Sequence, residues 1–296
     1  MIPRTIARVA ALLTLLIIPL ATSAQGGGQG GNPQMREAAR LHVEGQHAEA
    51  QQIYRDLIAA ASTPQERAAP QRAMARSAGF TGDCALAIEY EEMVIAYHQT
   101  REASDPQDAF YQQGEMANEA ARICADAGAL DEAERMYRRG SELGNREPAP
   151  RTHPQELWDF RLAHALARIA AQRGQRDEAD RHVADARRAL DAIAVVDSTL
   201  GRQQERFYQY LPGYVALFTN DIATAVSEFE RSTAIPGNNR DPQLRFLLGL
   251  AYERAGRSEE AMAQYRRSYE TASGNNPPNS FARREAGRKL EGQTGR

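Results

Sequence analysis

Residues 244–269 read LRFLLGLAYERAGRSEEAMAQYRRSY and predict two short amphipathic helices joined by a tight turn. Gly256 ends the first helix, because glycine adopts the left-handed conformation of a helix C-terminus without steric cost. Ser258 can cap the N-terminus of the second helix. The apolar residues of the first helix recur at intervals of three and four, which places them on one stripe; they are Leu244, Leu247, Leu248, Ala251, Tyr252 and Ala255.

The second helix of this stretch carries Ala261, Tyr265 and Tyr269 on one face. The small alanine lets the two helices approach closely, and the tyrosines fill the space beyond it. Two helices of this length cannot bury both of their apolar faces alone. The hairpin therefore needs neighbours of the same kind on either side.

The same turn recurs along the chain. Six times, a turn residue stands five positions before an alanine, and successive alanines lie 36 to 46 residues apart. Helical patterning continues through the longer intervals, so we interpret the extra length mainly as longer helices. The six pairs are Gly45 and Ala50, Gly82 and Ala87, Gly128 and Ala133, Gly174 and Ala179, Asn220 and Ala225, and Gly256 and Ala261.

This order of residues resembles the tetratricopeptide repeat family, whose repeat is about 34 residues long. Gly249, Tyr252, Gly256, Ala261 and Tyr265 stand where that family places its small, large, turn, small and aromatic residues. The family's leading tryptophan and late proline have no match here. The resemblance implies an all-α fold, an α-solenoid in the form of a right-handed superhelix, whose concave face binds peptides or protein segments.

The predicted fold is a stack of about six helix pairs over residues 33–273, followed by a loop and a capping helix over 274–296. We expect kinks or split helices at Pro70 and Pro212, because each proline lies inside a predicted first helix. We also expect a loop over residues 141–151.

A second loop is expected over residues 274–279, which read GNNPPN. The last predicted helix, 281–290, could cover the exposed end of the stack, as solenoids require. Its apolar residues are Phe281, Ala282, Ala286 and Leu290.

The N-terminus has the three parts of a secretory signal. Arg4 and Arg8 precede an apolar run, and residues 21–24, ATSA, provide a small-residue cleavage site. We therefore expect residues 1–24 to be removed, which gives an exported, periplasmic or extracellular protein with no stable membrane span. A retained anchor and a mitochondrial presequence are the alternatives. Residues 25–32, QGGGQGGN, read as a flexible linker.

Composition argues against nucleic-acid binding. The formal net charge is -3 and the pI is about 6.1, whereas a nucleic-acid protein usually has a strongly basic domain or stripe. The six histidines form no metal-binding pattern, and no nucleophile motif, phosphate loop or paired CxxC stands in the folded part. We therefore expect no cofactor, no metal and no enzymatic activity. Trp158 is interpreted as core packing rather than as a ligand platform.

Cys84 and Cys124 are the only cysteines. They fall on helices that should be adjacent and antiparallel, at about the same level, so a disulfide is one interpretation. It would suit an exported protein and could stabilise the fold by roughly 3 to 5 kcal/mol. Two buried thiols are the alternative, because sequence alone does not fix the Cβ geometry.

The family's geometry places the residues three before and one after each small packing residue of a first helix on the groove. With Ala75, Ala121, Ala167 and Gly213 as the small residues, this rule selects Arg72, Arg76, Asn118, Arg122, His164, Arg168, Tyr210 and Tyr214. Arginine forks pair bidentately with carboxylates, so this row suits an acidic or C-terminal carboxylate segment with an apolar flank.

Some members of the family use such a carboxylate clamp, which the residues here match in part. The alternative is a solvated face whose arginines pair with Asp126, Glu115 and Glu119. The sequence thus predicts a non-catalytic exported scaffold that binds a peptide or protein segment in its concave groove. The alternative function is a structural component of an envelope or secretion assembly that acts through its convex face or end helices.

Overall fold

The computed structural model describes residues 32–294. The predicted signal of residues 1–24 and all but the last residue of the linker lie outside the described residues. Asn32, that last residue, caps the first helix, because its side chain accepts a hydrogen bond of 2.8 Å from the Gln34 amide.

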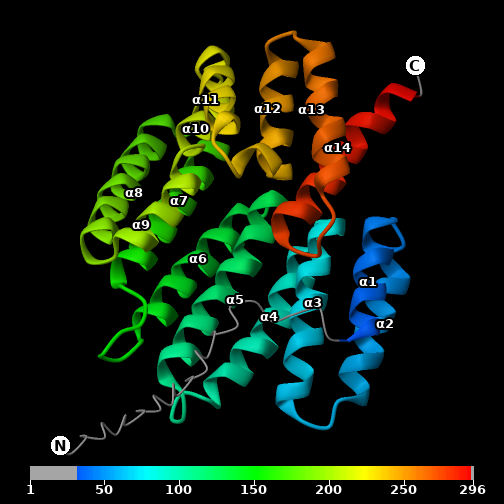
Figure 1. Cartoon of the computed structure of the whole chain (residues 1–296), viewed down its shortest axis with the longest axis vertical. Helices are drawn as coiled ribbons and strands as arrows, with labels where there is room; N and C mark the ends of the chain where they lie inside the picture. The colour runs from blue at the N-terminus through cyan, green and yellow to red at the C-terminus, as the bar shows by residue number, and fades with distance from the viewer. Residues whose placement is uncertain (1–31, 295–296) are drawn as a thin grey trace, which may run out of the picture.

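The described part of the chain consists of helices and connecting turns, with no strand, which confirms the all-α solenoid (Figure 1). The helices are α1 (Pro33–Val43), α2 (His47–Ala60), α3 (Pro64–Thr81), α4 (Cys84–Gln99), α5 (Pro106–Asp126), α6 (Leu130–Asn145), α7 (Gln155–Gln172), α8 (Arg176–Val196), α9 (Ser198–Tyr208), α10 (Leu211–Phe218), α11 (Ile222–Ala234), the 3-10 helix η1 (Asn238–Arg240), α12 (Pro242–Arg254), α13 (Ser258–Thr271) and α14 (Pro277–Thr294). Among the described residues, none of these helices has the length and apolar character needed to cross a membrane.

Consecutive helices pack in antiparallel pairs, and each pair packs on the next. All six predicted turn residues have a positive φ, from 67° at Asn220 to 84° at Gly45 and Gly128. The alanine five positions after each turn residue is buried, with at most 2% of its surface exposed. At Gly249, a side chain would collide with the Tyr265 ring, since an added Cβ would lie 2.7 Å from it. The hairpin pattern of the sequence therefore specifies the packing inside each pair.

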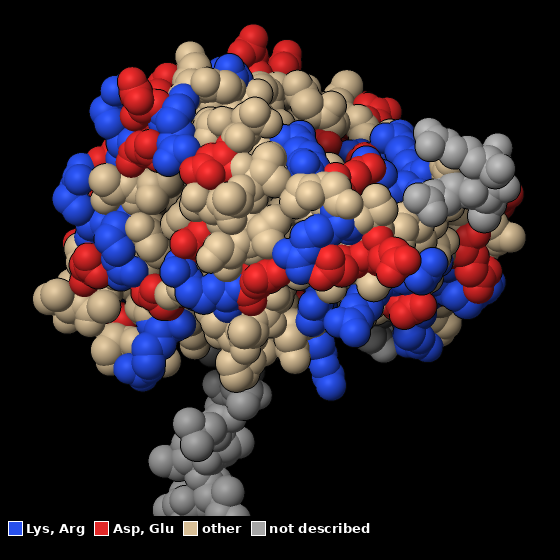
Figure 2. Space-filling view, turned by 90° about the horizontal axis from the view of Figure 1, so that it is seen from above, with Lys and Arg blue, Asp and Glu red and all other residues tan. Residues whose placement is uncertain are grey.

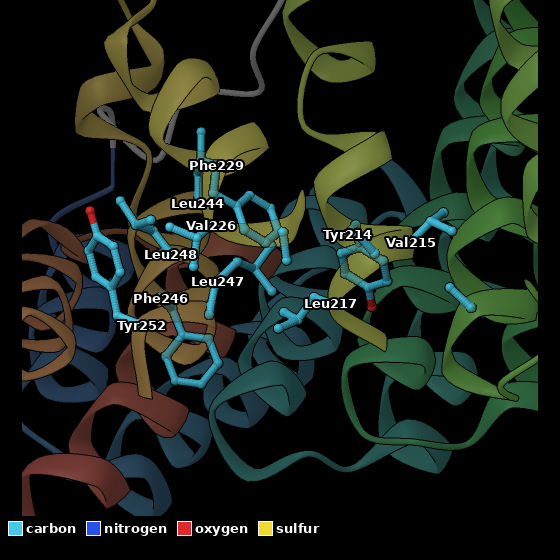
Figure 3. Close-up of a cluster of buried hydrophobic side chains, with 14 of the residues drawn as sticks. Tyr214, Val215, Leu217, Val226, Phe229, Leu244, Phe246, Leu247, Leu248 and Tyr252 are labelled. Carbon is cyan, nitrogen blue, oxygen red and sulfur yellow. The ribbon is translucent and has the colours of Figure 1, made fainter. Parts of the chain in front are cut away.

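The apolar cores of the pairs join along the stack. Figure 3 shows one such cluster, in which Tyr214 and Leu217 of α10 lie beside Phe229 of α11 and Leu247 of α12. Trp158 is fully buried, as expected, and its ring fills the space beside Gly144, where an added Cβ would lie 2.0 Å from a ring atom.

Two of the four irregular segments predicted in the sequence have different bounds in the structure. The loop expected over 141–151 is wrong in its first half, because α6 continues to Asn145. Gly144 offers the flat surface on which Trp158 packs, and this burial outweighs the poor helix propensity of glycine. The loop expected over 274–279 ends earlier, because Pro277 and Pro278 begin α14, where a proline needs no hydrogen-bond donor.

The two prolines expected to disturb helices behave differently. At Pro212 the helix is split, because α9 ends at Tyr208 and α10 begins at Leu211. At Pro70, α3 continues without a break. Pro70 is itself buried, and the packing of α3 against α2 and α4 holds the helix although one backbone hydrogen bond is missing.

A disulfide joins Cys84 at the start of α4 to Cys124 in α5, with the Cα atoms 4.6 Å apart. The structure therefore contains a disulfide rather than two buried thiols at these positions. The bond ties the second helix pair to the third.

The last helix does more than cover the end of the stack. Phe281 and Leu290 pack against the cluster of the last pairs, as the capping prediction requires. However, α14 also contacts α3 and α5, so the C-terminal part of the chain returns to the first half of the solenoid (Figure 1). The two ends of the solenoid are consequently in contact, and α14 contributes to the boundary of its inner face.

Candidate ligand-binding cavity on the concave face

The inner face contains a cavity of about 550 Å³. The first helices α5, α7 and α12 supply much of its lining, and α9 together with Tyr210, which follows it, supplies another wall. The η1 loop and the beginning of α14 complete it. Pockets of 300 to 1,000 Å³ are typical of ligand sites in proteins. The closure of the solenoid therefore turns the expected open groove into a bounded site.

Five of the eight residues predicted to face the groove line this cavity. They are Asn118, Arg122, His164, Arg168 and Tyr210. Arg72 and Arg76 do not line it but bind Glu119, which does. Tyr214 is buried in the core, where its hydroxyl accepts a hydrogen bond from Gln172.

The floor of the cavity has two arginines that share one carboxylate. Arg122 Nε and Arg168 Nη2 each lie 3.3 Å from an oxygen of Asp126. The Arg168 side chain is only 2% exposed, its guanidinium lies 5.1 Å from the centre of the Tyr214 ring, and its Nε has no partner within residues 32–294. Arg122 also donates to the side chain of Gln243 on α12. Two guanidinium groups against one carboxylate leave an excess positive charge in a partly desolvated site.

A second pair of arginines holds Glu119 at the edge of the cavity. Arg72 donates to both carboxylate oxygens at 2.9 and 2.8 Å, and Arg76 does so at 3.0 and 2.6 Å. Although burial alone would raise it, Arg76 and Arg72 hold the pKa of Glu119 well below its usual range. Burial and the Glu119 charge raise the pKa of Glu91 well above its usual range, which favours the neutral form of its carboxyl group.

The ion pairs agree in part with the alternative interpretation, in which the predicted arginines lie on a solvated face and pair with nearby carboxylates. Asp126 and Glu119 are partners of the arginines, as that alternative requires, whereas Glu115 pairs with Arg161. The arginines are nevertheless not on an open, solvated face. At least three quarters of each of the four side chains is shielded from solvent.

Aromatic rings form the remaining wall of the cavity. The Tyr210 ring lies edge-on to His164 with the centres 5.4 Å apart, and the centre of the Phe160 ring lies 5.9 Å from that of the imidazole. At the rim, the Arg206 guanidinium lies 4.5 Å from the centre of the Phe207 ring. The wall offers an apolar and aromatic surface next to the cationic floor.

His164 is held neutral in this wall. Burial lowers its pKa to about 3, and the charges of Arg168 and Arg122 act in the same direction. Its Nε2 lies 3.2 Å from the Phe207 carbonyl oxygen, so the tautomer with a proton on Nε2 donates to that oxygen. His164 thereby fixes α9 against α7 on one side of the cavity.

The protein is expected to lose stability as the pH falls from 6.5 towards 5, in part through His164. Its pKa is lower in the folded than in the unfolded chain, so the unfolded chain binds the proton first, which costs about 1 to 2 kcal/mol over this range. His164→Gln should reduce this slope in urea unfolding experiments at several pH values. His182→Gln is the control, because His182 lies beside Glu178 and Asp185 of its own helix. An equal effect of both substitutions would contradict the assignment.

Several wall residues are absent from the sequence prediction. Arg161, Arg206, Phe207 and the segment 276–278 come from another face of α7, from α9 and from the start of α14. The split at Pro212 is the one sequence signal that bears on them, since it allows α9 to fold over the cavity. Within the described residues, no group of three or more histidine, cysteine, aspartate or glutamate side chains could hold a metal ion.

Two comparisons bear on the family. Residues 242–275 match the family model described as Tetratricopeptide repeat. This range covers α12, α13 and the turn between them, which is the hairpin that the sequence pattern singles out. No curated protein matches the chain in sequence.

Proposed function

Because residues 242–275 match the tetratricopeptide repeat model and the same hairpin pattern recurs along the chain, we propose that the protein is a non-catalytic scaffold whose concave cavity holds an acidic peptide or protein segment. Tetratricopeptide repeats mediate contacts between proteins, and the hairpin of α12 and α13 lines the cavity through Leu244.

The observation that carries the proposal is the pair of arginines on the cavity floor. Arg122 and Arg168 share the single carboxylate of Asp126, and Arg168 retains a buried donor without a partner. A buried donor without a partner is costly, and an anionic ligand would satisfy it. The neighbouring rings of Phe160 and Tyr210 suit an apolar side chain next to that anion.

The proposal favours a chain segment over a broad charged surface. On the face shown in Figure 2, basic and acidic side chains are interspersed, with no extended area of one sign. A polyanion such as a nucleic acid would need an extended basic stripe. The arginines of the inner face instead gather around the cavity, on its floor, at its edge and at its rim.

Replacing Arg206 by glutamate is expected to weaken binding of an acidic peptide about tenfold or more without loss of fold. Arg206 lies at the rim, is exposed, and its guanidinium group lies against the Phe207 ring. The substitution therefore reverses a charge at the site and breaks no ion pair. A short labelled peptide of glutamate and phenylalanine, followed by fluorescence anisotropy at low and high salt, measures the effect.

Arg202→Glu is the matched control for this experiment. Arg202 lies one turn earlier on α9, outside the cavity lining, and its side chain donates to Thr199. Both substitutions change the net charge by the same amount on the same helix. Equal weakening by both would indicate general electrostatic attraction, and no binding by the wild type would refute the proposed function.

The same proposal places the protein outside the cytoplasm, with the N-terminal segment as its export signal. A disulfide such as that between Cys84 and Cys124 persists in oxidising compartments and is rare in the cytosol, which supports this location. Fractionation of the native cells with an antibody against the protein tests it, because a cytoplasmic location with reduced cysteines would contradict the proposal.

A role as a structural component of an envelope or secretion assembly is the second candidate. Val195 and Val196, at the end of α8, are 86% and 59% exposed, and they offer a small apolar surface outside the cavity. Size analysis of the protein separates the two candidates, because self-assembly that Val195→Asp abolishes would favour the second.

A further inference from the structure

The first and last parts of the solenoid meet along a polar seam. We define the seam as the contacts that Asn275, Ser280, Arg283 and Arg284 make with α1, α2, α3 and α5. Asn275 is only 2% exposed, and its amide nitrogen lies 3.0 Å from both the Tyr54 hydroxyl and the Ala73 carbonyl oxygen. These bonds join residues more than 200 positions apart in the sequence.

Two arginines of α14 bind carbonyl groups at the ends of three helices. Arg283 donates to the Val43 carbonyl oxygen at 2.5 Å, and Arg284 donates to the Gly79 and Asp126 carbonyl oxygens at 3.1 and 2.7 Å. These carbonyls lie in the last turns of α1, α3 and α5. Carbonyl groups there lack partners inside the helix and carry the negative end of its dipole, so a guanidinium group is a suitable partner.

The apolar contacts of α14 lie on the other side of the seam. Phe281, Ala286 and Leu290 belong to the cluster that contains Leu247 and Tyr265 of the last pair. The described clusters of α1 to α6 contain no residue of α12, α13 or α14. The last helix is therefore attached to its own end of the solenoid by apolar burial, but to the opposite end by hydrogen bonds.

This difference makes the seam easier to separate than the apolar interfaces between successive pairs. Water can replace hydrogen bonds when the seam separates, so each bond contributes a modest net free energy, whereas separation of successive pairs would expose their shared apolar core. In a solenoid each repeat otherwise contacts only its neighbours in the chain. The geometry permits α12, α13 and α14 to move as one unit away from α3 and α5.

We propose that the seam is a clasp that opens to admit the ligand to the cavity. Residues 276–278, which lead into α14, form one wall of the cavity, and Gln243 of α12 accepts a hydrogen bond from Arg122 of its floor. Opening the seam removes this wall and releases Arg122 from Gln243. The inference deepens the proposed function, on which it rests, because it assigns a closed and an open state to the same site.

A bulky side chain at Gly79 should force the clasp open. An added Cβ at Gly79 would lie 2.1 Å from Ser280 Oγ and 2.9 Å from Ser280 Cβ, so Gly79→Leu cannot coexist with the seated α14. Leucine is a better helix former than glycine, so α3 itself should remain helical. The matched control is Gly287→Ala, because a Cβ there meets the Tyr269 ring at 3.4 Å, an ordinary contact.

A second variant weakens the clasp without adding bulk. Asn275→Ala, Arg283→Ala and Arg284→Ala together remove five hydrogen bonds across the seam, which should raise the open fraction on the order of 100-fold. Arg288→Ala is its control, since Arg288 is exposed and pairs with Glu285 of its own helix.

Pulsed electron paramagnetic resonance measures the opening directly in the full chain. Spin labels at Glu49→Cys on α2 and Arg266→Cys on α13 report the distance between the two ends, because both positions are exposed. We expect a longer-distance population in Gly79→Leu and in the triple variant, and the wild-type distribution in both controls. Unchanged distances in the two test variants, or global unfolding of both by circular dichroism, would overturn the proposal.

A peptide-binding experiment distinguishes a failure of the clasp from a failure of the proposed function. If the clasp admits the ligand, the labelled glutamate and phenylalanine peptide should associate about tenfold faster with the triple variant than with Arg288→Ala. An opened seam with an unchanged association rate would overturn the clasp. If no variant and no wild-type protein binds the peptide although the distances change, the opening stands and the proposed acidic ligand falls.

Discussion

Replacing both cysteines by serine is expected to destabilise the second and third helix pairs by about 4 kcal/mol. The disulfide between Cys84 and Cys124 closes a loop with a sequence separation of 40 residues, and the loss of loop entropy in the unfolded chain gives this magnitude. Because a solenoid can unfold in segments, the loss should appear in the transition that involves α3 to α6.

Urea unfolding combined with hydrogen exchange of α4 and α5 measures this loss. The oxidised protein treated with a reductant should show the same shift as Cys84→Ser/Cys124→Ser, and the reductant should have no effect on that variant. Equal stability of the oxidised and reduced protein would contradict the prediction. It would indicate that packing of Cys124, which is fully buried, stabilises this interface without the covalent bond.

The hairpins could be predicted from the sequence because their determinants are local. A turn residue and a small residue five positions later, as in Gly256 and Ala261, fix both the reversal of the chain and the close approach of the helices. The same local pattern brought Cys84 and Cys124 to one level on adjacent helices. Each of these predictions needed only one hairpin and its neighbour.

The extra length of the inner repeats shows where a local pattern is not sufficient. Longer helices were expected, and α5 and α8 are indeed long, at 21 residues each. In the fifth pair, however, the added residues form α9, a separate helix that folds towards α7 and brings Phe207 to the cavity. The direction of α9 depends on contacts with a helix two elements earlier, which the sequence pattern does not encode.

The closure of the solenoid could not be predicted for a related reason. Asn275 and Arg284 bind backbone carbonyls more than 150 positions away, and any residue can offer a carbonyl. Such contacts leave no sequence pattern at the acceptor. The predicted row of groove residues therefore includes the arginines of the cavity floor and part of its aromatic wall. The walls from α9 and α14 appear only when the chain is folded.

Replacing Asp126 by asparagine is expected to lower stability by about 3 to 5 kcal/mol and yet to raise the affinity for an acidic peptide. Asp126 is 6% exposed and is the carboxylate that Arg122 and Arg168 share. Removing one partner of a buried ion pair leaves the other charge without compensation, which is strongly destabilising. The same uncompensated charge increases the attraction for an anion in the cavity, by about tenfold in affinity at low salt.

Asp131→Asn is the matched control, because it changes the net charge equally at a side chain that is 91% exposed. Its ion pair with Arg173 should contribute less than about 1 kcal/mol, and peptide binding should not change. Urea unfolding and fluorescence anisotropy of both variants give the two quantities. A stability loss in Asp126→Asn with no gain in affinity would mean that the floor arginines serve the fold alone. Opposite changes in stability and affinity would show that the protein retains Asp126 at the expense of tighter binding.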